Sequence, residues 1–246
     1  MTNLPALTKR EFTAYFYSPM AYIIATFYLV FSGLSFYILL KDLRDANVMR
    51  NLTTFLGFIH TIFIPMVSMR LLAEERKSGT LEMLVTAPVT DAEIAISKFL
   101  GAGAFIMLMI LPTLLYTWVI TRVGGRPDFG LVYASYVGLL LLSAAYLSIG
   151  LFVSSLTSNQ IVAAILTFVV LFTLYFLIGF FSASGDSLPF HDKINWPDVI
   201  SYVHFGTHLD SFAKGLVDTR DVLYFLSITG VGLFLTVKSL ESRRWR

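Results

Sequence analysis

The residues whose types and spacing could do chemistry lie in one charged stretch, residues 70 to 98, between two hydrophobic runs. A short helix in this stretch with an apolar face beside the charges of Glu74 to Lys77 could fit a groove in a partner. A solvated loop, whose charges only keep it out of a membrane, is the alternative interpretation. The residues that would make the docking surface are Glu74, Glu75, Arg76, Lys77, Gly79, Thr80, Leu81, Glu82, Leu84, Val85 and Pro88.

The punctuation of this stretch predicts two short helices. Gly79 suits the end of the first helix, Thr80 can cap the second, and Pro88 stops it after two turns. The apolar side chains of the second helix recur at i, i+3 and i+4, which gives it one apolar face beside the charges. Thr90 and Glu93 have the spacing of a capping box and predict the start of the next helix.

The chain has no loop that could hold ATP. A phosphate-binding loop of the form G-x-x-x-x-G-K-[ST] needs a Gly-Lys pair, and no such pair occurs in the sequence. Cysteine is also absent, which removes thiol nucleophiles and thiolate metal sites. Any use of ATP therefore predicts a partner that binds ATP and magnesium, while this chain binds no cofactor itself.

Histidines offer two weaker candidates. His60 lies within a hydrophobic run, where an ionisable group is a suspect for a transport pathway, although a hydrogen bond to a neighbouring helix explains it equally well. His204 and His208, with Asp210 nearby, have a spacing that could place two imidazoles on one helical face. Interfacial packing is the better explanation, so we predict no metal site. An intramembrane protease is disfavoured, because no G-x-S-x-G motif and no acidic residue lie in the hydrophobic runs.

The elements that must position these residues are membrane spans. Of 246 residues, 56% are hydrophobic and only 14% are charged, whereas soluble domains carry about 25% charged residues. The net charge of +2 gives no basic face for nucleic acid. Because a span needs about 20 apolar residues, the charge-free runs predict an all-α protein with six spans, of which the last is the shortest. The predicted spans are 20–40, 51–69, 99–121, 131–153, 161–183 and 222–237.

Flanking segments complete the predicted topology of this single domain, 1–246. Charges beside apolar residues predict a helix on the membrane surface before residue 20, with an unstructured tail as the alternative. Basic residues at the C-terminus, including Arg243 and Arg244, favour a cytoplasmic location for both termini and for segment 70–98. Segment 184–221 is then extracytoplasmic, and short surface helices or an ordinary long loop would both fit it.

The stretch from Glu74 to Leu84, followed by Pro88 and by Lys98 near the next span, resembles the signature of type 2 ABC-transporter permeases. The chain is most similar to the gliding-motility-associated and the nitrous-oxide-reductase-maturation permease subunits. His204–Phe205, the stretch from Lys214 to Ser227 and the tail from Ser239 to Trp245 carry the same resemblance. It covers nearly the whole chain.

The resemblance implies a half-transporter of the bacterial inner membrane that acts without an enzymatic site of its own. Its partners would be a P-loop ABC ATPase, which docks on the short helix after Gly79, and a second permease chain, identical or related. A membrane scaffold or assembly factor that moves no solute is the alternative. The second, smaller cytoplasmic contact would be the hairpin residues Thr157, Ser158, Asn159 and Gln160.

Overall fold

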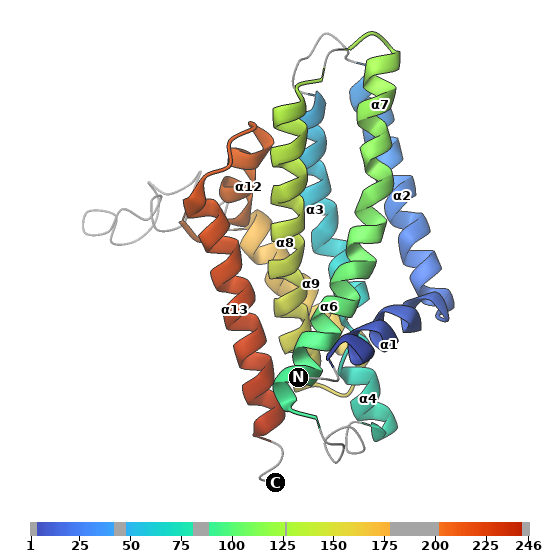
Figure 1. Ribbon diagram of the computed structural model, residues 1–246, viewed down its shortest axis with the longest axis vertical. Coiled ribbons are helices and arrows are strands. Elements are labelled where there is room, and N and C mark those ends of the chain that lie inside the picture. Colours follow the sequence, from blue (N-terminus) through green and yellow to red (C-terminus); the bar gives the residue numbers. More distant parts are fainter. Residues whose placement is uncertain (1–3, 42–47, 81–88, 126, 178–201, 243–246) are drawn as a thin grey trace, which may run out of the picture.

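The computed structural model describes residues 4–41, 48–80, 89–125, 127–177 and 202–242, and these are helices joined by short connections. Five helices or continuous helical stretches are long and apolar enough to cross a membrane. They run side by side in Figure 1. Their elements are α2 (Pro19–Leu40), α3 (Val48–Ser68), α6 (Asp91–Ile110) continued by η1 (Leu111–Leu114) and α7 (Leu115–Arg122), α8 (Phe129–Leu156), and α13 (Thr219–Glu241).

Four of the predicted spans coincide closely with α2, α3, the α6–α7 stretch and α8. The predicted fifth span, 161–183, is seen as the shorter apolar helix α9 (Gln160–Phe172) and one π-helical turn, η2 (Thr173–Leu177); its remainder lies outside the described residues. The count of six spans therefore stays a prediction. The predicted last span, 222–237, lies within the longer helix α13, which has 23 residues. A charge-free run covers only the part of a helix that lies in hydrocarbon. Helix α13 begins before that run, because its N-cap residue is Asp218.

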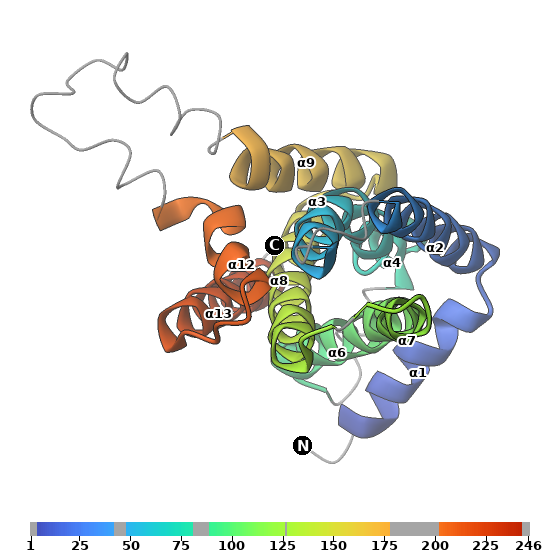
Figure 2. The same ribbon diagram turned by 90° about the horizontal axis from the view of Figure 1, so that it is seen from above.

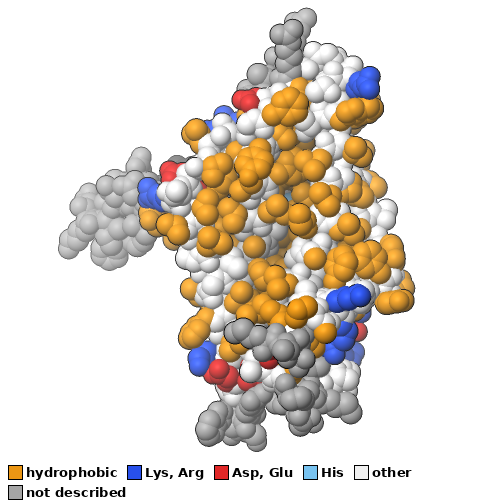
Figure 3. Space-filling view, viewed as in Figure 1, with side chains coloured by type: hydrophobic (Ala, Val, Ile, Leu, Met, Phe, Trp, Pro, Cys, Tyr) orange, Lys and Arg blue, Asp and Glu red, His pale blue; other side chains and the backbone are white. Residues whose placement is uncertain are grey.

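Helix α8 forms the centre of the bundle. Figure 2 shows α8 between α13 on one side and α3 and α6 on the other. In its most apolar window 67% of the residues are buried, whereas the value for α2 is 28%. An apolar helix that stays exposed suits lipid rather than water as its surroundings. In Figure 3 hydrophobic side chains cover the middle of the visible face, as expected for a protein in a bilayer.

Two short helices lie at one end of the bundle, which we call the α4 end. Helix α1 (Leu4–Phe16) lies across this end, and α4 (Ala73–Ser78) continues beyond α3 (Figure 1). Both termini of the chain are also at this end. Helix α1 packs against the start of α6, where Gly101 would have no room for a side chain beside Glu11 and the Phe12 backbone. The predicted N-terminal helix is therefore present and docked, not an unstructured tail.

Helix α12 (Phe205–Ala213) enters the bundle instead of lying only on its surface. Phe205, Leu209 and Phe212 are buried against α3, α8 and α13. The contact is close because glycines face it: Gly57, near the middle of α3, meets Leu209, and Gly138 of α8 meets Phe212. The expectation of purely surface helices in 184–221 is thus wrong for this helix, whereas residues 184–201 lie outside the described part.

Gly138 offers a test of this packing. A β-carbon at residue 138 would lie 2.6 Å from Phe212 Cβ, so Gly138→Ala should destabilise the purified protein by about 1–3 kcal/mol through overpacking. A thermal melt in detergent measures this as a fall in Tm. The matched control is Gly230→Ala in α13, where no heavy atom lies within 4 Å. Equal melting of the two variants would contradict the close contact of α8 with α12.

Candidate functional site

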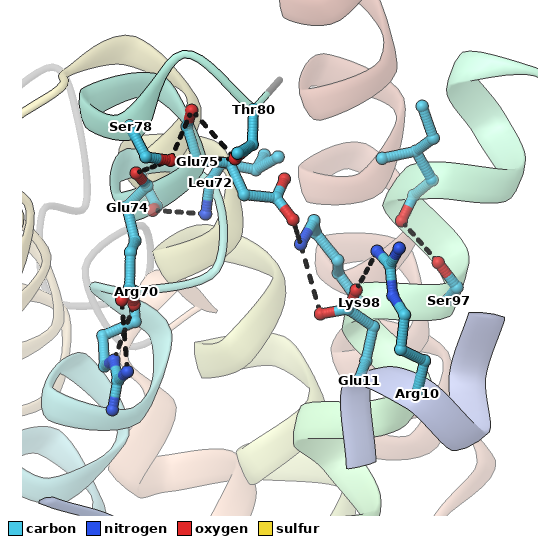
Figure 4. Close-up of polar contacts among 12 residues, drawn as sticks. Arg10, Glu11, Arg70, Leu72, Glu74, Glu75, Ser78, Thr80, Ser97 and Lys98 are labelled. Carbon is cyan, nitrogen blue, oxygen red and sulfur yellow. Dashed lines mark hydrogen bonds and ion pairs between the residues drawn. The ribbon is translucent and has the colours of Figure 1, made fainter. Parts of the chain in front are cut away.

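A buried ionic cluster joins three helices at the α4 end. Lys98 of α6 is only 2% exposed, and its Nζ lies 2.6 Å from Glu75 Oε1 of α4 and 3.2 Å from Glu11 Oε2 of α1. Figure 4 shows both carboxylates turned toward the ammonium group. We call Glu11, Glu75 and Lys98 the Lys98 cluster. It connects the surface helix, the charged loop and the third span at one atom.

The cations around Glu11 favour the ionised form of its carboxyl group. Burial by itself raises the pKa of Glu11, but Lys98 and Arg10 outweigh it and leave that pKa below its ordinary value. Arg10 Nη2 lies 2.8 Å from Glu11 Oε1 on the exposed side. A buried ammonium group without such partners would be strongly unfavourable. The ion pairs of Lys98 therefore help to fix the position of α4 relative to α1 and α6.

Ser154, near the end of α8, holds the first turn of α4 from the other side. Leu72 at the N-cap of α4 has no polar side chain, and two orphan amides need an acceptor there. Ser154 Oγ accepts from the N–H groups of Leu72 at 3.1 Å and Ala73 at 3.0 Å, and donates to the Met69 carbonyl at 3.2 Å. Arg76 adds a bond from Nη1 to the Ser155 carbonyl, 2.9 Å. Helix α4 is thus capped by α8.

Arg70 forms a third connection. Its Nε lies 2.8 Å from Glu74 Oε2, one turn away, and its Nη1 donates to Ser18 Oγ at the start of α2. Helices α1, α2, α3, α4, α6 and α8 are thereby connected by polar contacts within one small region.

The predicted docking residues divide into two groups. Gly79 has φ of 73° and ends α4, as predicted, because only glycine adopts that conformation without strain. The Thr80 hydroxyl lies 2.8 Å from that of Ser78, and Lys77 is exposed. The Thr90–Glu93 capping box is confirmed as well. The rest of the predicted docking helix lies outside the described residues, namely Leu81, Glu82, Leu84, Val85 and Pro88.

The hairpin between α8 and α9 lies at the same α4 end. Asn159 caps α9 by accepting from the Ile161 N–H at 3.0 Å, and Thr157 accepts from the Asn159 N–H at 3.1 Å. Ser158 is exposed, and Gln160 begins α9. These four residues are therefore available beside α4, where a partner could reach both.

The histidines have structural partners within the described part of the chain. His60 is buried, with Nε2 3.4 Å from the Tyr28 hydroxyl. His204 caps α12 through Thr207 and contacts the Tyr175 carbonyl. His208 Nδ1 lies 2.6 Å from Asp221 Oδ1, and its ring stacks on Tyr224. Asp210 forms ion pairs with Arg50 and Lys214. The described residues contain no group of three side chains that could hold a metal ion.

Sequence reasoning missed three of these contacts. Lys98 and Glu11 are 87 residues apart, and Ser154 is 82 residues from Leu72. His208 and Asp221 form a buried pair. This pair matches no metal-binding motif and lies outside the predicted spans. For the Lys98 and His208 contacts, the signal is an ionisable residue beside a long apolar run, since such a residue requires a partner.

Taken together, the apolar helical bundle and the charged cluster at its α4 end are those of a multi-pass membrane protein. The family model for ABC-2 family transporter proteins matches residues 6–237. The chain belongs to this family of type 2 ABC permeases, which are membrane subunits of transporters.

Curated relatives agree with this class. The chain is 26% identical over 179 residues to the inner membrane transport permease YhhJ of Escherichia coli K12, and equally to that of Shigella flexneri. The match covers 70% of this chain but 46% of the relative. The chain therefore corresponds to about half the length of these permeases.

Proposed function

We propose that this chain is the permease subunit of an exporter in the bacterial inner membrane, powered by a separate ABC ATPase. The observation that carries this proposal is the attachment of α4 to α1, α6 and α8 through the Lys98 cluster and Ser154. A solvated loop whose charges only kept it out of the membrane would need no such buried contacts. The absence of a Gly-Lys pair agrees with ATP and magnesium being bound by the partner.

The α4 end would face the cytoplasm, together with both termini. Basic residues lie there on α1, α4, α6 and the end of α13, and Arg70 lies between α3 and α4, which accords with the positive-inside rule. The relatives are described as inner membrane transport permeases, which supports this membrane as the location. Segments 184–221 and the α7–α8 connection would then be extracytoplasmic.

In the proposed cycle the ATPase engages residues 80–88 and the hairpin 157–160 from the cytoplasm. Closure of two ATPase subunits on ATP would push α4, and the buried ionic contacts would pass that displacement to α6 and α8. Two permease chains related by a two-fold axis would form the path between them, because closed two-fold pairing is the commonest arrangement of subunits. His60 remains a candidate for this path.

Affinity purification of the tagged chain from native membranes tests the docking role. We expect an ABC ATPase to co-purify, and Leu84→Asp to abolish its capture and the stimulation of ATP hydrolysis. The matched control is Leu216→Asp, which places the same charge on an exposed leucine near the start of α8, at the other end of the bundle. Capture of the ATPase by Leu84→Asp at the level of the control would contradict the proposal.

A further inference from the structure

Two cavities beside α1 share Tyr15 as a lining residue. The first has a volume of about 420 Å³ and is lined mainly by charged and polar groups, including Arg70, Glu74, Glu75 and Ser18. The second, of about 200 Å³, lies among apolar side chains of α1, α2 and α6 such as Ala25 and Phe105. Tyr15 lines both, because its ring stacks on Phe105 while its hydroxyl donates to the Val67 carbonyl at 3.3 Å. From these paired cavities we infer a binding site for one phospholipid with a zwitterionic ethanolamine headgroup.

The polar cavity selects a zwitterion by its charges. Its walls carry three cations, Arg10, Arg70 and Lys98, and three carboxylates, Glu11, Glu74 and Glu75. These opposite charges balance, so a ligand of either net charge would meet uncompensated repulsion or desolvation. A headgroup with one phosphate and one ammonium leaves the balance intact.

Two groups in the wall are ready for such a headgroup. Arg70 uses one N–H on each of its three nitrogens for Glu74 and Ser18, which leaves two of the five guanidinium N–H groups for a phosphate oxygen. Glu75 Oε1 accepts a hydrogen bond from Lys98 Nζ, and the buried Oε2 has no hydrogen-bond partner among the described residues. A buried carboxylate oxygen without a donor is unfavourable, and a primary ammonium group supplies one.

The apolar cavity is placed to take an acyl chain. Phe16, Tyr22 and Leu108 line it and are also exposed on the outside of the bundle, where the chain faces hydrocarbon. The polar cavity adjoins it on the side of α4, where water and headgroups begin. A lipid could therefore enter from the membrane leaflet at the α4 end, with its headgroup beside α4 and one chain along α2 and α6.

Native mass spectrometry of the delipidated full chain in detergent tests this site. We expect one dioleoyl phosphatidylethanolamine per chain, and roughly tenfold weaker binding of phosphatidylglycerol, which lacks the ammonium group. Ala14→Trp fills the polar cavity and Ala25→Trp the apolar one, and each should lower the affinity for phosphatidylethanolamine by a similar factor. Ala6→Trp is the matched control, since Ala6 is exposed on α1 and lines neither cavity.

Three results would overturn the inference. The first is equal binding of phosphatidylglycerol, and the second is competition by soluble phosphoethanolamine at the same concentration, which would mean that no acyl chain is recognised. The third is wild-type affinity in Ala14→Trp. Melting of each variant without lipid shows that it is folded, and if Ala25→Trp does not fold, Ala14→Trp decides alone. The ATPase takes no part in this experiment, so its outcome is independent of the proposed transport function.

Discussion

Lys98→Met is expected to cause the largest loss of stability of any single change at the α4 end. The substitution leaves Glu11 and Glu75 facing each other without their shared ammonium group. Removing one partner from a buried ion pair destabilises by about 3–5 kcal/mol. Thermal inactivation of the detergent-purified protein should therefore be much faster, and its half-life at a fixed temperature is the measurement.

The control for Lys98→Met separates the missing charge from the altered side chain. Removing both acids as well, in Glu11→Gln, Glu75→Gln, Lys98→Met, should recover much of the stability, because no buried charge is then unpaired and Arg10, which loses Glu11, is exposed. Lys9→Met removes an exposed ammonium group from α1 and should have little effect. If Lys98→Met behaved like Lys9→Met, the Lys98 cluster would not hold these helices together.

Ser154→Ala is expected to have the second largest effect, and it acts on α4 more than on the whole bundle. The change leaves the N–H groups of Leu72 and Ala73 buried without their acceptor, at about 1–3 kcal/mol for each unsatisfied group. The first turn of α4 should then open more often. Hydrogen exchange of the amides of residues 72–76 measures this directly, and permease-stimulated ATP hydrolysis should fall with it.

Ser158→Ala is the matched control for Ser154→Ala. Ser158 lies four residues further on, in the exposed turn between α8 and α9, so its hydroxyl should not protect α4. Unchanged exchange at Leu72 and Ala73 in Ser154→Ala would show that α8 does not cap α4. Faster exchange in both variants would equally contradict the specific role of Ser154.

The spans and the local caps could be predicted from the sequence because each depends on neighbouring residues. A charge-free run of sufficient length has to be a helix in hydrocarbon, which placed α2, α3 and α8 closely. Gly79 and the Thr90–Glu93 box are decided by backbone geometry within one turn. The residues that determine such a feature lie within a few positions of it in the sequence.

The site itself could not be predicted, because its contacts join residues far apart in the sequence. Nothing in the vicinity of Glu11 indicates that Lys98 will be its partner. The location of α12 could not be predicted for a related reason. Its sequence looks too polar for the interior of the bundle, but its polar groups have partners there. His208 Nδ1 lies 2.6 Å from Asp221 Oδ1, and Asp210 contacts Arg50 at 2.9 Å.

The location of α4 relative to the membrane tests the account most directly. The chain lacks cysteine, so Lys77→Cys and Leu216→Cys each provide one exposed thiol, at the α4 end and between α12 and α13. A membrane-impermeant maleimide should label Leu216→Cys in intact spheroplasts, and Lys77→Cys only in inside-out vesicles stripped of the ATPase. Labelling of Lys77→Cys in intact spheroplasts would place α4 outside and contradict its role in docking the motor.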